Sequence, residues 1–281
     1  MSIPILGGAP MHIFVTNDDG IESPGLFALK QALDPLGDVS VIAPDGNRSA
    51  MARSITIRRP LEVDEVQFPD GSTGYATDGT PVDCVRFAVL GLLGSTPDII
   101  VSGINHGLNL GDDVTYSGTV AAALEGVLLG WPAIAVSQQS TNREHWDTGN
   151  AAYDFRAVAA FVAALVPIAM REQFPRQVLL NVNAPGLTPP EVNGALVTRL
   201  GRRIYDDRLE LMEGGEGTRK RYRIYGDNPG HHPEAGSDFA AIEAGAISVT
   251  PLHFDLTDIG GMEHLERLAL NELLAEQQLA E

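Results

Sequence analysis

The first two thirds of the chain repeat one pattern, in which a short, continuously apolar run precedes a segment with helical spacing. His12–Thr16 comes before the helical pattern Pro24–Leu36, and Asp98–Ser102 lies upstream of a helix predicted from about Thr119 to Leu129. Strands that are apolar on both faces are typical of parallel sheets covered by helices on each side. The sequence therefore predicts an α/β fold built on a parallel sheet.

The other predicted strands are Val39–Ala43, Ser54–Val66, Gly74–Thr77, Ala133–Ser137 and Gln177–Val182, and the other predicted helices are Val82–Leu93 and Ala151–Glu172. Two later segments depart from the pattern. The polar segment Gly201–Gly226 predicts a hairpin, which is either a solvated flap or an arm that reaches another subunit. Thr257–Leu279 predicts an amphipathic helix whose leucine stripe covers its own sheet or a partner. No interdomain linker is evident, so residues 1–281 are expected to form a single domain.

The charge balance excludes one class of partner. Acidic residues number 37 against 19 basic ones, a formal net charge of −18 that repels nucleic-acid polymers. Cys84 is the single cysteine, so no intrachain disulfide is possible. The start of the chain lacks the basic region of a signal peptide, and the uncharged run Ala157–Met170 is too short to span a bilayer. We expect a soluble, cytoplasmic protein without a membrane partner.

An adjacent pair of acids, Asp18 and Asp19, follows the first predicted strand and precedes Gly20. Ligands of open parallel sheets bind where strands end, in the loops that lead into helices. Two neighbouring carboxylates repel each other and need a compensating cation or solvent. Hard oxygen ligands favour Mg²⁺ or Mn²⁺ over Zn²⁺. The alternative interpretation is an acidic turn that caps the following helix.

Three further strand-end loops offer oxygen ligands or anion donors. Ser49 follows the second strand, and the glycine-rich loop after the strand Asp98–Ser102 keeps Asn105 right at the end of that strand. The helix that opens near Ser117 and Thr119 presents free amides and two hydroxyls, a natural phosphate site. A plain N-cap is the alternative role for Ser117. Four such loops at one sheet edge favour a metal-assisted phosphate site.

The motifs Val15–Ile21, Asn47–Ala50, Ser102–Gly107 and Tyr116–Val120 occur in this order, together with Ser54–Thr56, Thr77–Cys84 and Ser248–Leu252. They resemble the SurE family of stationary-phase survival proteins over about residues 11–255. The resemblance implies a divalent-metal-dependent phosphatase of nucleoside 5′- and 3′-monophosphates, which in some members also acts on short polyphosphate. It implies a Rossmann-like three-layer core, and a homodimer or homotetramer that exchanges the hairpin 201–226 and the C-terminal helix 257–279. Met51–Arg53 departs from the family in a stretch that often holds a glycine.

The metal ligands that the resemblance implies are Asp18, Asp19, Ser49 and Asn105, around one Mg²⁺ or Mn²⁺ per subunit. Asp18 and Asp19 are then also the expected catalytic residues, because the ion that they hold would activate the attacking water.

The phosphate oxygens are expected to bind the Ser117 hydroxyl and the amides of Gly118 and Thr119, with help from Asn109. His106 is a candidate general acid for the leaving group, and the alternative is a hydrogen-bonded polar residue of the glycine-rich loop. The predicted reaction is hydrolysis of a nucleoside monophosphate to nucleoside and phosphate.

Two other functions share parts of this pattern. A receiver-like phosphorylation switch also carries an acid pair after its first strand, but needs a lysine at a late strand end. Lys30 and Lys220, the only lysines, fall in the first helix and the hairpin. A zinc-dependent deacetylase of the His-x-Asp-Asp type would have histidine where Thr16 stands. Both are weaker alternatives.

Overall fold

The computed structural model describes residues 10–143, 150–171, 177–205, 207–214, 217–224, 230–268 and 270. Its strands are β1 (Met11–Thr16), β2 (Gly37–Pro44), β3 (Val63–Gln67), β4 (Thr73–Thr77), β5 (Ile99–His106), β6 (Ala133–Gln138), β7 (Val178–Ala184), β8 (Ala195–Val197), β9 (Arg203–Ile204), β10 (Glu210–Met212), β11 (Arg221–Arg223), β12 (Gly230–His231) and β13 (Ile247–His253). Its α-helices are α1 (Pro24–Leu33), α2 (Pro81–Val89), α3 (Gly118–Leu128), α4 (Arg156–Arg171), α5 (Asp238–Glu243) and α6 (Ile259–Glu266), joined by 3₁₀ turns η1 (Asp34–Leu36), η2 (Gly111–Thr115) and η4 (Pro189–Glu191).

A nine-stranded sheet runs through the molecule in the order β3-β4-β2-β1-β5-β6-β7-β13-β8. The six strands from β4 to β7 in this order pair in parallel, whereas β3 and β13 run antiparallel to β4 and β7. The predicted α/β fold with a parallel sheet is confirmed. The chain leaves β1 toward β2 on one side and later returns to β5 on the other. The carboxyl ends of β1 and β5 therefore form the switch point at which such sheets bind ligands.

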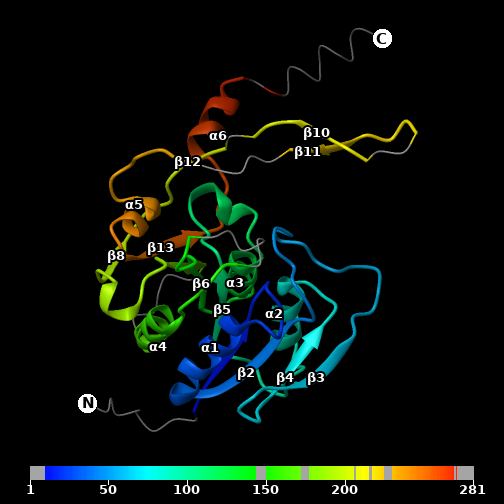
Figure 1. Ribbon diagram of the computed structural model, residues 1–281, viewed down its shortest axis with the longest axis vertical. Coiled ribbons are helices and arrows are strands. Elements are labelled where there is room, and N and C mark those ends of the chain that lie inside the picture. The colour runs from blue at the N-terminus through cyan, green and yellow to red at the C-terminus, as the bar shows by residue number, and fades with distance from the viewer. Residues whose placement is uncertain are drawn as a thin grey trace.

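Helices cover both faces of the sheet, with α1 and α4 on one face and α2 and α3 on the other (Figure 1). Alternate residues of β1 serve the two layers: Ile13 packs in the cluster of Leu29 and Val158, while Phe14 packs in the cluster of Val85. All five side chains are fully buried. This double coverage explains why the central strands are apolar without alternation, and it confirms the three-layer, Rossmann-like core.

The predicted strand Ser54–Val66 is wrong over most of its length, because only Val63–Gln67 forms β3. The preceding residues run over the start of α2. There the Thr56 amide donates to the Asp83 carboxylate at 3.1 Å, and the Thr80 hydroxyl donates to the carbonyl oxygen of Ser54 at 2.8 Å. Since these backbone groups bind a helix cap, they are not available to a neighbouring strand.

The predicted helix Ala151–Glu172 begins only at Arg156, and Glu172 lies outside the described residues. Backbone carbonyls of the preceding segment accept hydrogen bonds from the last residue of β6 and from the loop that follows it. Ala152 O accepts from the Thr141 amide at 2.7 Å, and Asp154 O accepts from Gln138 Nε2 at 2.8 Å. These bonds hold residues 151–155 in a non-helical path beside the carboxyl end of the sheet.

The last third of the chain carries two small antiparallel pairs, β9 with β12 and β10 with β11. The β10–β11 hairpin extends away from the main sheet, and α6 lies beside the base of the hairpin (Figure 1). The hairpin is thus confirmed, although Gly215 and Glu216 of its turn lie outside the described residues. Within the predicted helix 257–279, Ile259–Glu266 forms α6, and residues 269 and 271–279 are outside the description. Among the described helices, none has the length and apolarity that crossing a bilayer demands.

Candidate functional site

A sharp turn follows β1 and carries the two acids. Asn17, which is fully buried, holds the turn with its side chain: Nδ2 donates to Gly20 O at 2.9 Å, and Oδ1 accepts from the Gly20 amide at 3.2 Å. Gly20 has a φ of +103°, and a Cβ at this position would lie 3.0 Å from the backbone of Gly46. The turn therefore needs glycine for its conformation and for the close approach of the neighbouring loop.

Asp18 is buried, with 3% of its surface exposed, against the first turn of α3. Thr119 Oγ1 donates to Asp18 Oδ1 at 2.5 Å. Gly118 allows this approach, because a Cβ there would lie 2.8 Å from the Asp18 side chain. Burial, with a smaller contribution from the charge of Asp19, raises the pKa of Asp18 to about 6.

Asp19 faces β5 rather than α3. Its Oδ2 accepts from the His106 amide at 3.1 Å, and its Oδ1 lies 3.7 Å from His106 Nδ1. Burial raises the pKa of Asp19 to about 6 and lowers the pKa of His106. Two adjacent buried carboxylates that are ionised at neutral pH repel each other, so the turn favours a bound cation.

Asn105 and His106 are the last residues of β5, which continues past the predicted end at Ser102 with a register shift against β6 between Ser102 and Asn105. Asn105 Nδ2 donates to Gly107 O at 2.9 Å, which leaves its Oδ1 as the atom able to bind an outside ligand. The strand thus runs four residues beyond its predicted end, and Asn105 lies at the end of the strand as predicted. The strand end places its side chain at the same sheet edge as Asp18.

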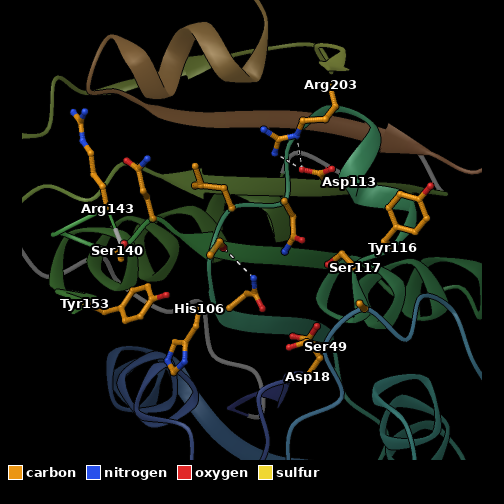
Figure 2. A pocket seen from close by; sticks show the side chains of 16 residues that line it. Asp18, Ser49, His106, Asp113, Tyr116, Ser117, Ser140, Arg143, Tyr153 and Arg203 are labelled. Atoms are coloured by element: carbon orange, nitrogen blue, oxygen red, sulfur yellow. Dashed lines mark hydrogen bonds and ion pairs between the residues drawn. The ribbon is translucent and has the colours of Figure 1, made fainter. Parts of the chain in front are cut away.

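A pocket of about 430 Å³ opens at this edge. It is lined by Asp18, Ser49, Ala50, Asn105, His106, Gly107, Leu108, Asn109, Asp113, Tyr116, Ser117, Gln139, Ser140, Arg143, Tyr153 and Arg203. Figure 2 shows Asp18, Ser49 and Ser117 at one end of the pocket, and Ser140, Arg143 and Tyr153 at the other. The structure thus brings Asp18, Ser49 and Asn105 together in the lining of one pocket.

Asn109 and Ser117 also line this pocket, whereas Asp19, Gly118 and Thr119 lie outside its lining. Asp19 lines an adjoining pocket of about 260 Å³ with His106. Gly118 and Thr119 are buried behind Ser117, and the Thr119 hydroxyl is committed to Asp18. Thr119 can therefore offer a phosphate only its backbone amide, because its hydroxyl already donates to Asp18.

Ser117 caps α3, because its Oγ accepts from the Val120 amide at 3.1 Å. A hydroxyl that accepts one bond still has its own proton to donate. The capping role and the predicted phosphate contact are therefore compatible in one side chain.

The site and fold can be compared with known proteins. The family model described as "Survival protein SurE" matches residues 13–207. The chain belongs to the SurE family. It is 52% identical to the "5'-nucleotidase SurE" of Rubrobacter xylanophilus, over 94% of this chain and 99% of the relative, and 46% identical to that of Chloroflexus aggregans, over 92% and 98%. The crystal structure of the SurE protein from Aquifex aeolicus superimposes with a TM-score of 0.75 at 37% identity, covering 92% of this chain and 99% of that one.

In this SurE-family chain, a buried asparagine network beneath the pocket was not predicted. The backbone N–H of Asn109 donates to Asn183 Oδ1 at 2.8 Å, and the side-chain Nδ2 of Asn109 donates to Ser137 Oγ at 2.7 Å. Asn181 and Asn183 both donate to the carbonyl oxygen of Asn109. The sequence signal is the pair of asparagines spaced by two in the otherwise apolar β7, which puts both on one face of the strand.

The far end of the pocket was also missed. Tyr153 stacks on His106, with ring centroids 4.7 Å apart, and burial together with the charge of Asp19 raises its pKa to about 12. Arg203 Nε donates to Asp113 Oδ2 at 2.8 Å on the upper wall (Figure 2). The sequence pattern predicts Tyr153 in a helix and Arg203 in the hairpin, so it gives no reason to place either residue at this pocket.

Proposed function

We propose that this chain is a divalent-metal-dependent phosphomonoesterase that hydrolyses nucleoside 5′-monophosphates, and also 3′-monophosphates, to nucleoside and phosphate. The names of the SurE relatives at 52% and 46% identity support the nucleotidase activity. The observation that carries the proposal is the buried carboxylate pair Asp18–Asp19, which lies at the sheet switch point beside a pocket that also holds a helix N-terminus.

The donor set suits a hard divalent cation. Asp18, Asp19, Ser49 and Asn105 would offer carboxylate, hydroxyl and carboxamide oxygens, which are ligands that Mg²⁺ and Mn²⁺ prefer. The raised pKa values of both acids support this assignment, because a cation relieves the cost of keeping them ionised. When bound, one such ion per subunit would supply an activated water and positive charge opposite the phosphoryl oxygens.

The chain's own groups would bind the rest of the phosphate. Ser117 would donate its hydroxyl proton, and the Gly118 and Thr119 amides at the start of α3 would add the partial positive charge of a helix N-terminus. Asn109, held by Asn183 and Ser137, would steady the phosphate from the pocket floor. These fixed donors offset the repulsion that a chain of net charge −18 exerts on an anionic substrate.

The nucleoside would extend toward the opposite end of the pocket. A volume of about 430 Å³ is within the range of small-molecule sites. Tyr153, stacked on His106, offers an aromatic surface and a phenolic hydroxyl, and Ser140 adds a second hydroxyl. His106 would donate the proton that the leaving sugar oxygen needs only in its protonated form, which burial disfavours by lowering the pKa of this residue.

The assembly proposed for this chain is a homodimer or homotetramer built by exchanging the hairpin arm, residues 201–226, and the C-terminal helix, residues 257–279. Large apolar side chains are exposed on the described parts of both elements. They include Leu209, Leu211, Tyr222, Ile224, Ile259, Met262 and Leu265, each at least 47% exposed. Apolar surface of this extent is costly in water unless a partner covers it. The core and these two elements would then act as a single catalytic domain.

The cytoplasm is the proposed compartment. Cys84 is a buried free thiol, which suits a reducing environment.

A substrate panel tests the proposed function. Purified protein would be assayed with nucleoside 5′- and 3′-monophosphates, deoxy forms and short polyphosphate, first in EDTA and then with Mg²⁺ or Mn²⁺ in excess. We expect no phosphate release in EDTA and restored release of phosphate from nucleotides on adding either ion. Hydrolysis that persists in EDTA would contradict the metal dependence, and absence of release with every nucleotide would contradict the nucleotidase.

A further inference from the structure

A buried carboxylate on α3 is held by two arginines from different parts of the chain. Glu125 is 1% exposed, and its two oxygens each lie 2.6 Å from a guanidinium: Oε2 from Arg53 and Oε1 from Arg86. Arg86 comes from the last turn of α2. Arg53 comes from the loop after β2, four residues beyond Ser49. The two ion pairs neutralise the same buried charge, but only one of them reaches the loop that carries Ser49.

The loop around Ser49 is bent in a way that its own residues do not favour. Ala50 and Ala52 have φ values of +58° and +50°. This left-handed region is unfavourable for residues that carry a Cβ, so contacts with the surrounding structure must hold the loop there. The side chain of Met51 does not supply them, since it is 40% exposed.

Contacts on both sides of Ser49 keep the loop in this conformation. Upstream, the Arg48 amide donates to Asp18 O at 2.7 Å, which anchors the loop to the end of β1. Downstream, the Ala52 amide donates to Tyr116 O at 3.0 Å, just before the start of α3. Arg53 then completes the second anchor through Glu125, eight residues along α3 from Ser117.

A third contact restrains the Arg53 side chain. Its guanidinium lies over the ring of Phe254, 5.2 Å from the centroid, on the chain segment that leaves β13. An arginine held between a buried carboxylate and an aromatic ring has little freedom to move.

We propose that Arg53 is a positioning residue: its ion pair with Glu125 holds the Ser49 loop against Asp18 and so sets the affinity of this site for its divalent ion. This inference rests on the proposed function, in which Ser49 is a metal ligand. Partners that orient metal ligands typically change metal affinity about 10–100-fold when they are removed. Arg53 would be a partner of this kind, because it restrains the loop that carries Ser49 without binding the ion itself.

The structure provides a matched control for the test. Arg53→Met and Arg86→Met each remove one of the two cations from Glu125 and leave the other, so neither variant strands an unpaired buried charge. A purely structural role of the ion pairs would make both variants behave alike. A positioning role distinguishes them, because Arg86 does not belong to the Ser49 loop.

Two measurements on the full chain distinguish a positioning role of Arg53 from a purely structural one. Titration with Mn²⁺, followed by the EPR signal of the free ion, gives the affinity, and amide hydrogen exchange reports on the Ala52 amide in metal-free protein. For Arg53→Met we expect about tenfold weaker Mn²⁺ binding and faster exchange at residues 50–53, with kcat recovered at saturating Mn²⁺. For Arg86→Met we expect Mn²⁺ affinity and exchange in this loop to match the parent.

Unchanged Mn²⁺ affinity in Arg53→Met, or an equal loss in both variants, would overturn the inference. A parent protein that bound no Mn²⁺ would overturn the proposed metal site, and this inference with it. The two failures are distinguishable, since the first is seen only in the variants.

Discussion

Thr119 Oγ1 donates a hydrogen bond of 2.5 Å to Asp18 Oδ1, and this bond joins the first turn of α3 to the end of β1. Thr119 is fully buried and Asp18 is 3% exposed. The bond favours the ionised form of Asp18 against the burial that raises its pKa. A helix that was expected to serve the phosphate thus also orients the carboxylate proposed to bind the metal.

Thr119→Val tests this relationship, because valine keeps the shape of the side chain and removes the donor. We expect about 1 kcal/mol lower stability from the lost hydrogen bond, and about tenfold weaker Mn²⁺ binding because Asp18 becomes harder to ionise and orient. Thr119→Ser retains the hydroxyl and serves as the control, with an affinity near that of the parent. Equal Mn²⁺ affinities in all three proteins, measured by calorimetric titration, would contradict the prediction.

Asp18→Asn and Asp19→Asn should each abolish turnover while leaving the protein folded. Each variant removes one carboxylate whose ionised form is disfavoured by burial, and Asp19→Asn also removes the charge that helps to raise the pKa of Asp18. We therefore expect the metal-free variants to be more stable than the metal-free parent at neutral pH, by roughly 1–3 kcal/mol. Asp64→Asn, an exposed charge on β3, is the control for net charge alone. Substantial activity in either site variant would contradict its role as a ligand.

The same two acids predict how the stability of the metal-free protein depends on pH. Each has a pKa near 6 in the folded state and 3.8 in the unfolded chain, so the folded state binds more protons between these values. The free energy of unfolding should consequently fall as the pH rises from about 4 to about 6. Urea titrations in EDTA across this range would measure the effect.

Other carboxylates titrate over a different pH range in the same protein. Hydrogen bonds from Arg156 lower the pKa of Asp154, which adds stability above its ordinary pKa and loses it at more acidic pH. The difference between the parent and the Asp18→Asn/Asp19→Asn double variant isolates the contribution of the pair. A pH profile identical in these two proteins would show that burial does not shift the two acids as described.

The sequence predicted the positions of those site residues that depend on their immediate neighbours in the chain. Asp18 and Asp19 follow an apolar strand, and Ser117 precedes a helical pattern, so the residues that determine each position are neighbours in sequence. The α/β fold was predictable for the same reason: strands that are buried on both faces show this in their composition.

Contacts between residues far apart in the sequence place Tyr153 and Arg203 at the pocket, and these positions could not be predicted from the sequence. Helical spacing extended to Ala151, but hydrogen bonds to Thr141 and Gln138 outweigh helix propensity and keep Tyr153 beside the pocket. Arg203 reaches the pocket because Asp113, 90 residues earlier, accepts its hydrogen bonds. The spacing of residues along the chain carries no information about contacts over such separations.

Removal of the hairpin tests the proposed exchange between subunits. The described strands β10 and β11 form an isolated two-stranded sheet, and such a pair is marginally stable in water without a surface to cover it. Replacing residues 207–224 by a short Gly-Ser linker would keep Arg203 and Tyr205 in place on Asp113. We expect light scattering to give a lower oligomeric mass for this variant than for the parent.

A milder variant separates loss of the apolar contact from loss of the segment. Leu211→Ser with Tyr222→Ser keeps the hairpin but makes two paired, exposed apolar positions polar. If the hairpin covers a partner, burial of both side chains contributes to assembly, and the double variant should dissociate at a higher protein concentration than the parent. The parent mass retained in both variants would identify the hairpin as a solvated flap, since a flap can be shortened or made polar without changing how the subunits associate.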